Sequence, residues 1–156
     1  MTKEKVYNGS MDTLSNNKPC PHCGRYNNRA ATVDAVIIKD NKVLLIKRGS
    51  EPFRNYWGLP GGYVDWDETL EDAVKREVKE EVGATVISLK QMGIYSDPKR
   101  HPQQTIDVSY EVDIEGEIKA GDDAKEYKWF DLKELPQLAF DHRQIMNKLR
   151  NILDNS

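Results

Sequence analysis

The sequence predicts an α/β domain over residues 31–156, in which a mixed β-sheet packs between helices. Three patterns predict this class. Apolar residues alternate with polar ones from Ile106 to Ile114, which is the period of a strand buried on one face. Shorter strand-like segments flank a helical pattern that starts near Thr69. A second helical pattern follows Asp141 near the end of the chain.

The domain begins with a predicted β-hairpin. Residues 33–38 and 43–46 are rich in Val, Ile and Leu, which is typical of strands, and Asp40-Asn41 between them is typical of a turn. The next stretch, SEPFRNYWGLPGG at 50–62, follows neither the strand period nor the helical period. We expect an irregular loop there that forms one wall of a binding site, since such loops often carry function.

A helix is predicted to start near Thr69 and to end at Gly83. Asp72 stands three residues after Thr69, in an arrangement like a capping box. Glycine commonly ends a helix because it accepts the left-handed conformation that closes the last turn. On a helical wheel the segment has one apolar stripe. The stripe consists of Leu70, Ala73, Val74, Val78 and Val82.

Glu77 and Glu81 fall inside this apolar stripe, and Glu80 lies on its flank. Carboxylates that face a core are costly unless a positive charge compensates them. A divalent cation does so, because hard metals such as Mg²⁺ bind carboxylate oxygens. Glu77 and Glu81 are one turn apart and can hold one cation, and Glu80 can take a second. The alternative is a solvated helix end with an Arg76–Glu80 ion pair.

Three more elements are expected after this helix. Strands are predicted at 86–95 and 127–130, and the break at 96–102 and the turn at 121–123 are rich in Gly, Pro and Asp. Asp141 is expected to cap the last helix. Its apolar side consists of Ile145, Leu149, Ile152 and Leu153. Residues 1–30 are polar and are expected to form an arm outside the domain.

Composition excludes several classes of function. The net charge is −3 and the isoelectric point is near 5.7, which argues against nucleic-acid binding through a basic surface. Hydrophobic residues make up 38% of the chain, the mean hydropathy is −0.74, and no apolar run approaches the ~18 residues of a membrane span. The N-terminus lacks the apolar stretch of a secretion signal, so a cytoplasmic protein is expected by default.

Cys20 and Cys23 are the two cysteines, in the sequence Cys-Pro-His-Cys-Gly. The spacing is typical of one half of a zinc ribbon, but structural zinc takes four ligands and a second cysteine pair is absent from the sequence. Three interpretations stay open. The pair is a vestigial half-site, or a Zn²⁺ site shared between two chains, or it serves redox chemistry or is completed by His101 or His142.

The segment from Gly62 to Ala84 resembles the signature of the Nudix hydrolases, which is glycine, five residues, glutamate, seven residues, and then Arg-Glu-aliphatic-X-Glu-Glu-X-Gly-aliphatic. The matching positions are Gly62, Glu68, Arg76, Glu77, Val78, Glu80, Glu81, Gly83 and Ala84. Ala84 is small where a bulkier aliphatic residue is usual, which affects packing. Nine positions at fixed spacing are a strong signal. The resemblance covers roughly residues 32–150.

The resemblance implies a Nudix-type α/β/α sandwich with a central mixed sheet, and a Mg²⁺ or Mn²⁺ site in which the Gly61 carbonyl joins the three glutamates. Arg76 is expected to orient these glutamates by hydrogen bonding, and Glu68 to anchor the loop to the helix. The general base varies in this family. Candidates are Glu126, Asp123 and Asp122 in the predicted late loop, with Glu80 as a competitor.

Downstream residues are similar to the ADP-ribose pyrophosphatase branch of the family. These are Tyr95-Ser96-Asp97-Pro98 with Arg100, Trp129-Phe130 and Phe140-Asp141-His142; Pro98 is the proline that this branch carries about fifteen residues after Gly83. Arg48 and Arg100 are candidates to bind phosphate. The candidates to hold adenine against a ring are Phe53, Tyr56, Trp57 and Tyr63.

The resemblance therefore implies hydrolysis of a nucleoside diphosphate linked to another group, with ADP-ribose giving AMP and ribose 5-phosphate. Alternatives are an NADH pyrophosphatase, a (deoxy)nucleoside triphosphate pyrophosphatase, and a regulator that binds the nucleotide without cleaving it. The intact acidic residues, and the lack of a DNA-binding module after the last helix, argue against the regulator. Many relatives form homodimers, so a dimer is among the expectations.

The cysteine pair generates the first prediction. If two chains share one tetrahedral site, purified protein carries about half an equivalent of zinc per chain. Elemental analysis of the purified protein measures this ratio. Protein that is isolated free of zinc from zinc-supplemented medium contradicts the shared site.

Overall fold

The computed structural model describes residues 18–26, 28–119 and 126–156. Its elements, in chain order, are β1 (Ala31–Val36), β2 (Ile38–Lys39), β3 (Lys42–Lys47), β4 (Trp57–Gly58), β5 (Gly61–Tyr63), α1 (Leu70–Val82), β6 (Thr85–Tyr95), the 3₁₀ turn η2 (Pro98–Arg100), β7 (Ile106–Glu115), β8 (Tyr127–Asp131) and α2 (His142–Asp154). The predicted turn at 121–123 lies outside the described residues.

The strands form two sheets. In the larger sheet, in the order β5-β1-β7-β6, β1 runs parallel to β7 and the other neighbours are antiparallel. The smaller sheet is antiparallel and joins β2, β3 and β4, with β8 on β3. A mixed sheet between helices was predicted, and the structure confirms it. The second sheet was not predicted, because two-residue strands such as β4 carry no period in the sequence.

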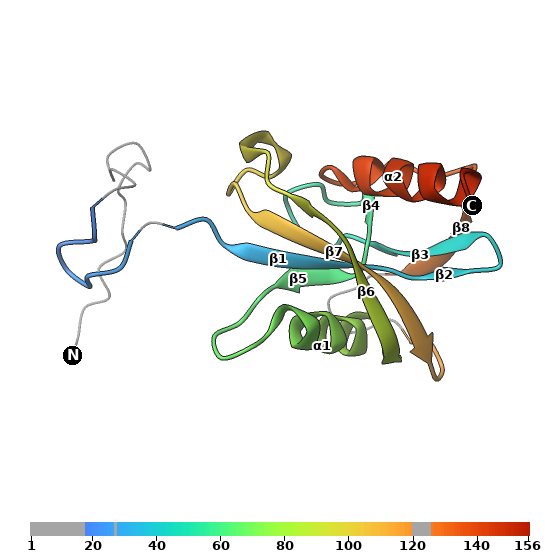
Figure 1. The fold of residues 1–156 in the computed structure, drawn as a ribbon, viewed down its shortest axis with the longest axis horizontal. Helices are drawn as coiled ribbons and strands as arrows, with labels where there is room; N and C mark the ends of the chain where they lie inside the picture. The colour runs from blue at the N-terminus through green and yellow to red at the C-terminus, as the bar shows by residue number, and fades with distance from the viewer. Residues whose placement is uncertain (1–17, 27, 120–125) are drawn as a thin grey trace.

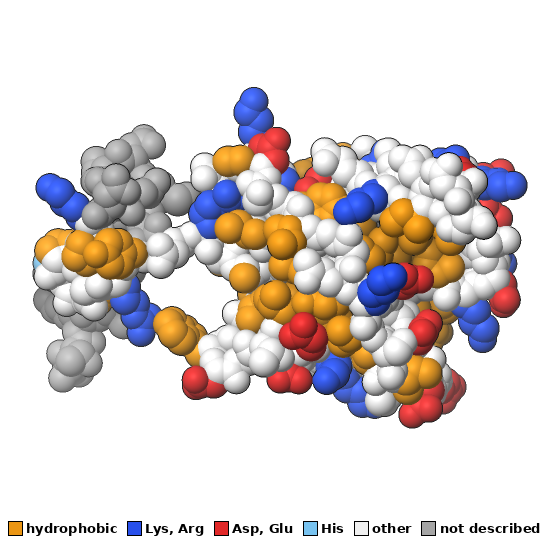
Figure 2. Space-filling model, viewed as in Figure 1, with side chains coloured by type: hydrophobic (Ala, Val, Ile, Leu, Met, Phe, Trp, Pro, Cys, Tyr) orange, Lys and Arg blue, Asp and Glu red, His pale blue; other side chains and the backbone are white. Residues whose placement is uncertain are grey.

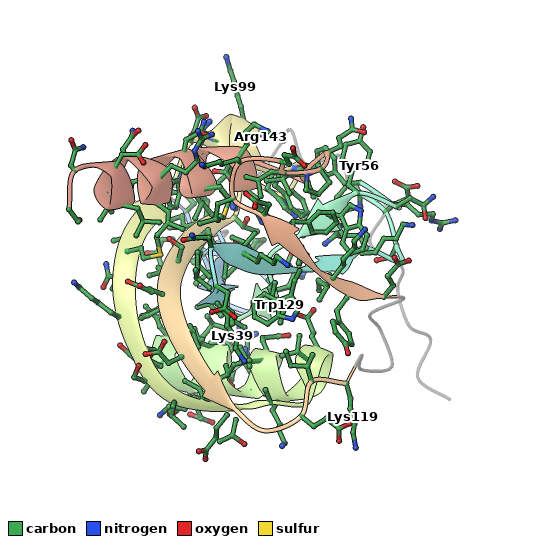
Figure 3. All side chains as sticks on the ribbon, turned by 90° about the vertical axis from the view of Figure 1, so that its right-hand side faces the viewer. Lys39, Tyr56, Lys99, Lys119, Trp129 and Arg143 are labelled. Carbon is green, nitrogen blue, oxygen red and sulfur yellow. The ribbon has the colours of Figure 1, made fainter. Side chains whose placement is uncertain are left out.

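The two helices lie on opposite sides of the sheets, which gives the molecule three layers (Figure 1). One core fills the space between the sheets and α1, where Trp129 of β8 also packs (Figure 3). A second core packs α2 against the opposite side. Successive residues of β3 serve different cores: Leu44 and Ile46 belong to the first, and Val43 and Leu45 to the second. This alternation is the period of a strand buried on both faces.

Helix α1 has the predicted ends and the predicted buried face. The Thr69 hydroxyl accepts a hydrogen bond from the Asp72 amide, at 3.1 Å. Gly83 ends the helix in the left-handed conformation, with φ of 72°. The buried residues are Ala73, Val74, Val78 and Val82, and Leu70 packs partly buried against them. The sequence pattern therefore placed this helix correctly.

Helix α2 differs from the prediction in two respects. Ile152 and Leu153 are exposed, and His142 and Met146 are buried together with Ile145 and Leu149. Asp141 precedes the helix as predicted, but its side chain makes no capping hydrogen bond. The carboxylate instead pairs with Arg100.

The sequence predicted an irregular loop at 50–62, but the structure contains two short strands in this stretch. Trp57-Gly58 pairs with β3 in the smaller sheet, and three residues later Gly61 begins β5 on the edge of the larger sheet. The chain therefore crosses from one sheet to the other through Leu59-Pro60. These strands depend on partners that are distant in the sequence, so local patterns do not reveal them.

The face of the larger sheet near the start of α2 is polar. Odd-numbered residues of β7 point to this face, because Val108, Tyr110 and Val112 belong to the α1 core. Asp107 and Ser109 are fully buried there, and Thr32 of β1 donates a hydrogen bond of 2.8 Å to Asp107. Buried polar side chains at the centre of a domain are costly, so this layer marks a site that the fold protects.

The cysteine arm leads away from the three layers (Figure 1). Arg25 of the arm lies 5.2 Å from the centre of the Trp66 ring, which precedes α1. On the face seen in Figure 2, acidic and basic side chains are interspersed around apolar patches. Within the described ranges, no helix has the length and apolar character needed to cross a membrane.

Candidate functional site

A cavity of about 610 Å³ opens between β5 and α2. Its wall includes Glu81 of α1, the glycines of β5, and Arg48 after β3. The segment 100–105 and Phe140 contribute the rest of the wall, with Asp34 of β1 and His142 of α2. The volume lies within the range of about 300–1,000 Å³ that small-molecule sites occupy.

Glu81 is a half-buried carboxylate in the wall of this cavity. Its Oε2 atom accepts a hydrogen bond of 2.8 Å from the Gly61 amide. Burial raises the pKa of Glu81 to about 8, and the charges of Glu77 and Asp34 act in the same direction, against the hydrogen bond from Gly61. A carboxylate with such a high pKa is one whose ionised form lacks sufficient positive charge around it.

Arg76 ties the glutamates of α1 to the loop that precedes the helix. Its guanidinium donates to both oxygens of Glu68, at 2.7 and 3.0 Å, and to Glu77 Oε1 at 2.7 Å. It also donates to the Tyr63 carbonyl at 2.9 Å and lies 3.3 Å from Glu80. Burial raises the pKa of Glu77, although Arg76 opposes the shift. The geometry fits the orienting role predicted for Arg76 and the anchoring role predicted for Glu68.

Two glycines leave room for the carboxylates. A Cβ atom at Gly61 would overlap the Val33 carbonyl and Asp34, and one at Gly62 would overlap the Glu77 carboxylate. Any side chain at either position would therefore displace the acidic groups. The lack of space, and not a left-handed backbone conformation, therefore explains glycine at these positions.

The residues present fit a hard divalent cation. Glu77 and Glu81 supply carboxylate oxygens whose raised pKa values show unmet negative charge. Glu80 is exposed at the end of the same face. Within 18–26, 28–119 and 126–156, no three acidic, His or Cys side chains already stand in a metal-binding arrangement. Glu77 is held by Arg76 and Glu81 by the Gly61 amide.

Asp34 and His142 form a buried pair at the base of the cavity. His142 Nε2 lies 3.1 Å from Asp34 Oδ2, and His142 Nδ1 accepts a hydrogen bond of 3.0 Å from the Leu59 amide. Both side chains are buried. The sequence analysis considered His142 as a zinc ligand for the cysteines and did not identify Asp34. Asp34 is the charged residue of β1, between Val33 and Ala35, and a charge inside an apolar strand is the signal that could have identified it.

Arg100 is committed to protein partners in this structure. It is buried, donates to both oxygens of Asp141 at 2.9 and 2.8 Å, and donates to Thr105 at 2.8 Å. The sequence predicted an arginine that binds phosphate. Arg100 does line the cavity, but its guanidinium supports the wall through Asp141.

Arg48 faces the cavity beside aromatic rings. Its guanidinium carbon lies 4.7 Å from the centre of the Phe140 ring, and His101 stacks on Phe140 at 4.8 Å. Burial lowers the pKa of Arg48, and the negative charges of Glu81 and Asp34 oppose this shift. Burial also lowers the pKa of His101, and the charges of Arg100 and Arg48 add to this effect. The result is a cationic and aromatic region in the same cavity as the acidic residues.

Tyr63 is the candidate adenine-binding ring that lines the cavity. The prediction placed Phe53, Tyr56 and Trp57 in the cavity as well, and the structure does not. Phe53 packs edge-on against Tyr56 and Phe140, and Trp57 packs against Phe130. Among the described residues, the other aromatic rings that line the cavity are those of Phe140, His101 and His142. The sequence noted Phe140 only as part of a resemblance, because its distance from the acidic helix along the chain hides their proximity.

The predicted general bases lie elsewhere or beyond the described residues. The Glu126 carboxylate is half-exposed, 3.6 Å from Lys47, and does not line the cavity. Asp122 and Asp123 lie outside the described residues. Glu80 is exposed and close to Arg76. The choice among these three loop acids and Glu80 stays a prediction.

Cys20 and Cys23 stand in a turn that Gly24 closes with φ of 71°. Backbone N–H groups of His22 and Cys23 lower the pKa of Cys20. In the part of the chain that the structure describes, no third ligand joins them. His142 is engaged by Leu59 and Asp34 and does not complete a site with them. A Zn²⁺ ion shared by two chains, like a homodimer, stays a prediction.

Comparisons with known proteins agree with this geometry. The sequence matches the family described as NUDIX domain over residues 28–149. An ADP-ribose pyrophosphatase of Methanocaldococcus jannaschii is 50% identical over 123 residues, which are 78% of this chain and 73% of that protein.

Two solved structures are also similar. The NUDIX domain of Shewanella oneidensis NrtR, crystallised with ADP ribose, has a TM-score of 0.73 and 31% identity over 82% of this chain and 90% of that one. A bifunctional NMN adenylyltransferase/ADP ribose pyrophosphatase of Francisella tularensis, complexed with AMP and a Mn ion, has a TM-score of 0.68 and 28% identity. That similarity covers 80% of this chain and 42% of the other.

The raised pKa of Glu81 predicts how the stability of the metal-free protein depends on pH. Between the ordinary value of 4.5 and about 8, the folded protein keeps a proton on Glu81 that the unfolded chain loses. The free energy of unfolding therefore falls as pH rises through this window, by up to about 1.4 kcal/mol per pH unit. Urea unfolding in the presence of a chelator at several pH values measures the slope.

Glu81→Gln is the matched variant for this experiment. It should reduce the slope without abolishing it, because burial also raises the pKa of Asp107, to about 9, which adds a slope of the same sign. An unchanged slope in this variant contradicts the assignment to Glu81.

Proposed function

The chain belongs to the Nudix family, and we propose on that basis that it is a divalent-cation-dependent pyrophosphohydrolase that converts ADP-ribose to AMP and ribose 5-phosphate. One observation carries the proposal. A single cavity joins the half-buried carboxylate Glu81 to a region where Arg48 lies over Phe140. A nucleoside diphosphate sugar needs both, since its pyrophosphate is anionic and its base is planar. The similarity to an ADP-ribose pyrophosphatase over most of both chains supports this substrate.

Glu77, Glu80, Glu81 and the Gly61 carbonyl are the groups that would hold Mg²⁺ or Mn²⁺. When bound, such a cation neutralises phosphate charge and lowers the pKa of a bound water. Arg76 would keep Glu77 oriented through the hydrogen bond between them. Glycine at positions 61 and 62 lets the backbone and the carboxylates approach each other closely.

The chain's own residues orient the substrate and accept the proton. In the hydrolysis, the oxygen of a water forms a bond to one phosphorus atom while the bond from that phosphorus to the bridging oxygen breaks. The water proton passes to a carboxylate, for which Glu80, Asp123 and Glu126 are the predicted candidates. The AMP and ribose 5-phosphate halves then separate as phosphate monoesters. Arg48 would bind the pyrophosphate oxygens, and its presence in the wall of the same cavity as Glu81 supports this role.

A nucleotide-binding regulator is the second candidate, because the NUDIX domain of Shewanella oneidensis NrtR was crystallised with ADP ribose. Binding alone would use the same cavity, so turnover discriminates the two functions. The presence of all three candidate metal-binding glutamates favours the enzyme.

The metal assignment predicts that Glu81→Gln nearly abolishes turnover while the fold survives. Loss of a cation ligand removes several kcal/mol of transition-state stabilisation, which corresponds to a fall in kcat of at least about 100-fold. Phosphate release from ADP-ribose, after treatment of the products with a phosphatase, measures this effect. Glu117→Gln is the matched control, since Glu117 is exposed and pairs with Lys119 on the surface. Activity of Glu81→Gln equal to that of the control refutes the assignment.

The substrate assignment predicts the order of activities in a panel with added Mg²⁺. ADP-ribose should have the highest kcat/KM, above NADH, diadenosine polyphosphates and deoxynucleoside triphosphates. The reason is that the cavity offers one cationic and aromatic region next to the acidic residues. A higher kcat/KM for a triphosphate overturns the substrate. Tight binding of ADP-ribose without cleavage supports the regulator.

A further inference from the structure

We infer that Asp34 and His142 are a positioning pair that holds residues 58–61, and thereby fixes the Gly61 backbone for the cation site. The inference rests on the proposed function for the role of Gly61 as a cation ligand. It assigns a task to two buried side chains that neither the Nudix signature nor the reaction itself requires. Asp34 lies in β1 and His142 begins α2, so the pair also joins the larger sheet to α2.

The hydrogen bonds of His142 determine its tautomer. Nδ1 accepts from the Leu59 amide at 3.0 Å, so the ring proton of the neutral imidazole is on Nε2. Nε2 then donates to Asp34 Oδ2, which lies 3.1 Å away. The ring also contacts the backbone at Gly58, where an added Cβ would lie 3.3 Å from its Nδ1 and Cε1 atoms. His142 therefore holds the backbone at 58–59 directly.

The Leu59 amide needs this acceptor because of where it lies. Gly58 ends β4 in the smaller sheet, and Gly61 begins β5 in the larger sheet. Between them the chain leaves one ladder before it enters the next, so no strand supplies a partner for Leu59 N–H. A buried amide without an acceptor costs about 1–3 kcal/mol. His142 supplies the acceptor from a third element.

The other end of the segment reaches the cation site. Pro60 accepts a hydrogen bond of 2.8 Å from the Ala35 amide, and Gly61 is the register partner of Asp34. The Gly61 amide then donates to Glu81. A shift of residues 58–61 would therefore move both the Gly61 carbonyl and the donor that orients Glu81.

The alternative is that His142 merely fills space in the core. An apolar residue would fill the same volume without the cost of burying a polar pair. It would leave Leu59 N–H and Asp34 without partners. The imidazole ring contacts Leu59, two residues before Gly61, and Asp34, the register partner of Gly61. These two hydrogen bonds support a positioning role.

Two substitutions separate the two bonds of the ring. An Asn amide reaches about as far as Nδ1, so His142→Asn can keep the acceptor for Leu59 and loses the donor to Asp34. A Gln amide reaches about as far as Nε2, so His142→Gln can keep the donor and loses the acceptor for Leu59. Asp34→Asn removes the charge that Nε2–H faces and keeps the shape.

The measured quantity is the Kd of Mn²⁺, by electron paramagnetic resonance of the free ion. Each of the three variants should raise this Kd by about 10- to 100-fold, the usual effect of losing a group that orients a metal ligand. In the double variant Asp34→Asn/His142→Asn the effects should not add, because both changes act on the same contact between Nε2–H and residue 34. A second readout needs no metal. Hydrogen exchange of the Leu59 amide should be faster in His142→Gln than in His142→Asn.

Ile145→Val is the control for stability. Ile145 is fully buried one turn further along α2 and does not line the cavity. This variant should lower the melting temperature and leave the Kd of Mn²⁺ within about twofold of wild type. Folded Asp34 and His142 variants that bind Mn²⁺ as wild type does overturn the inference. So does a control that loses Mn²⁺ affinity to the same extent.

The outcomes distinguish this inference from the proposed function. Wild-type protein that binds no Mn²⁺ refutes the cation site and, with it, the task assigned to the pair. If the wild-type protein binds Mn²⁺ and the variants of the pair weaken this binding, but ADP-ribose is not cleaved, only the substrate assignment is refuted. If a variant fails to fold, the exchange rate of Leu59 in the remaining His142 variant still tests the bond to Nδ1.

Discussion

The burial of Glu81 is the constraint on which the rest of the site depends. A carboxylate on the apolar face of α1 lies among the residues that hold the helix to the sheet, and its desolvation raises its pKa to about 8. One hydrogen bond from Gly61 does not offset that burial. Glu81 therefore binds a proton or a cation more readily than a solvated glutamate on the opposite face of the helix would.

The surrounding structure brings positive and polar groups to the same place. Arg76 binds Glu68 and Glu77 and so links α1 to its preceding loop. On the other side of the cavity, Arg100 and Asp141 form a buried ion pair that joins η2 to the start of α2. Between them lies the polar layer of the sheet, where Asp34 contacts His142. Each helix thus contributes a charged residue or pair next to the cavity.

The cavity also shows why the family accepts different ligands. The acidic residues of α1 come from one short helix, whereas Arg48, His101 and Phe140 come from three separate loops. Changes in those loops would alter ligand preference without moving the cation ligands. A regulator and an enzyme can therefore share one fold.

The sequence by itself determined α1, its ends and its buried face, because all the relevant contacts lie within a few residues of one another. The period of the helix placed Glu77 and Glu81 among Val74, Val78 and Val82, and that local pattern carried the prediction of a cation site. The alternation of apolar and polar residues from Ile106 to Ile114 likewise predicted the strand β7.

Only the tertiary structure decided what completes the cavity. Asp34 and His142 are more than a hundred residues apart in the chain, and the charge of Asp34 in an apolar strand does not reveal which residue it contacts. Arg100 was predicted to be free for phosphate, and its burial against Asp141 depends on where α2 begins. Phe53, Tyr56 and Trp57 share the composition of a binding loop, but their rings pack against other aromatic rings and do not line the cavity. The physical reason is the same in each case: these groups act through partners that the fold, and not the local sequence, brings within hydrogen-bond or van der Waals distance.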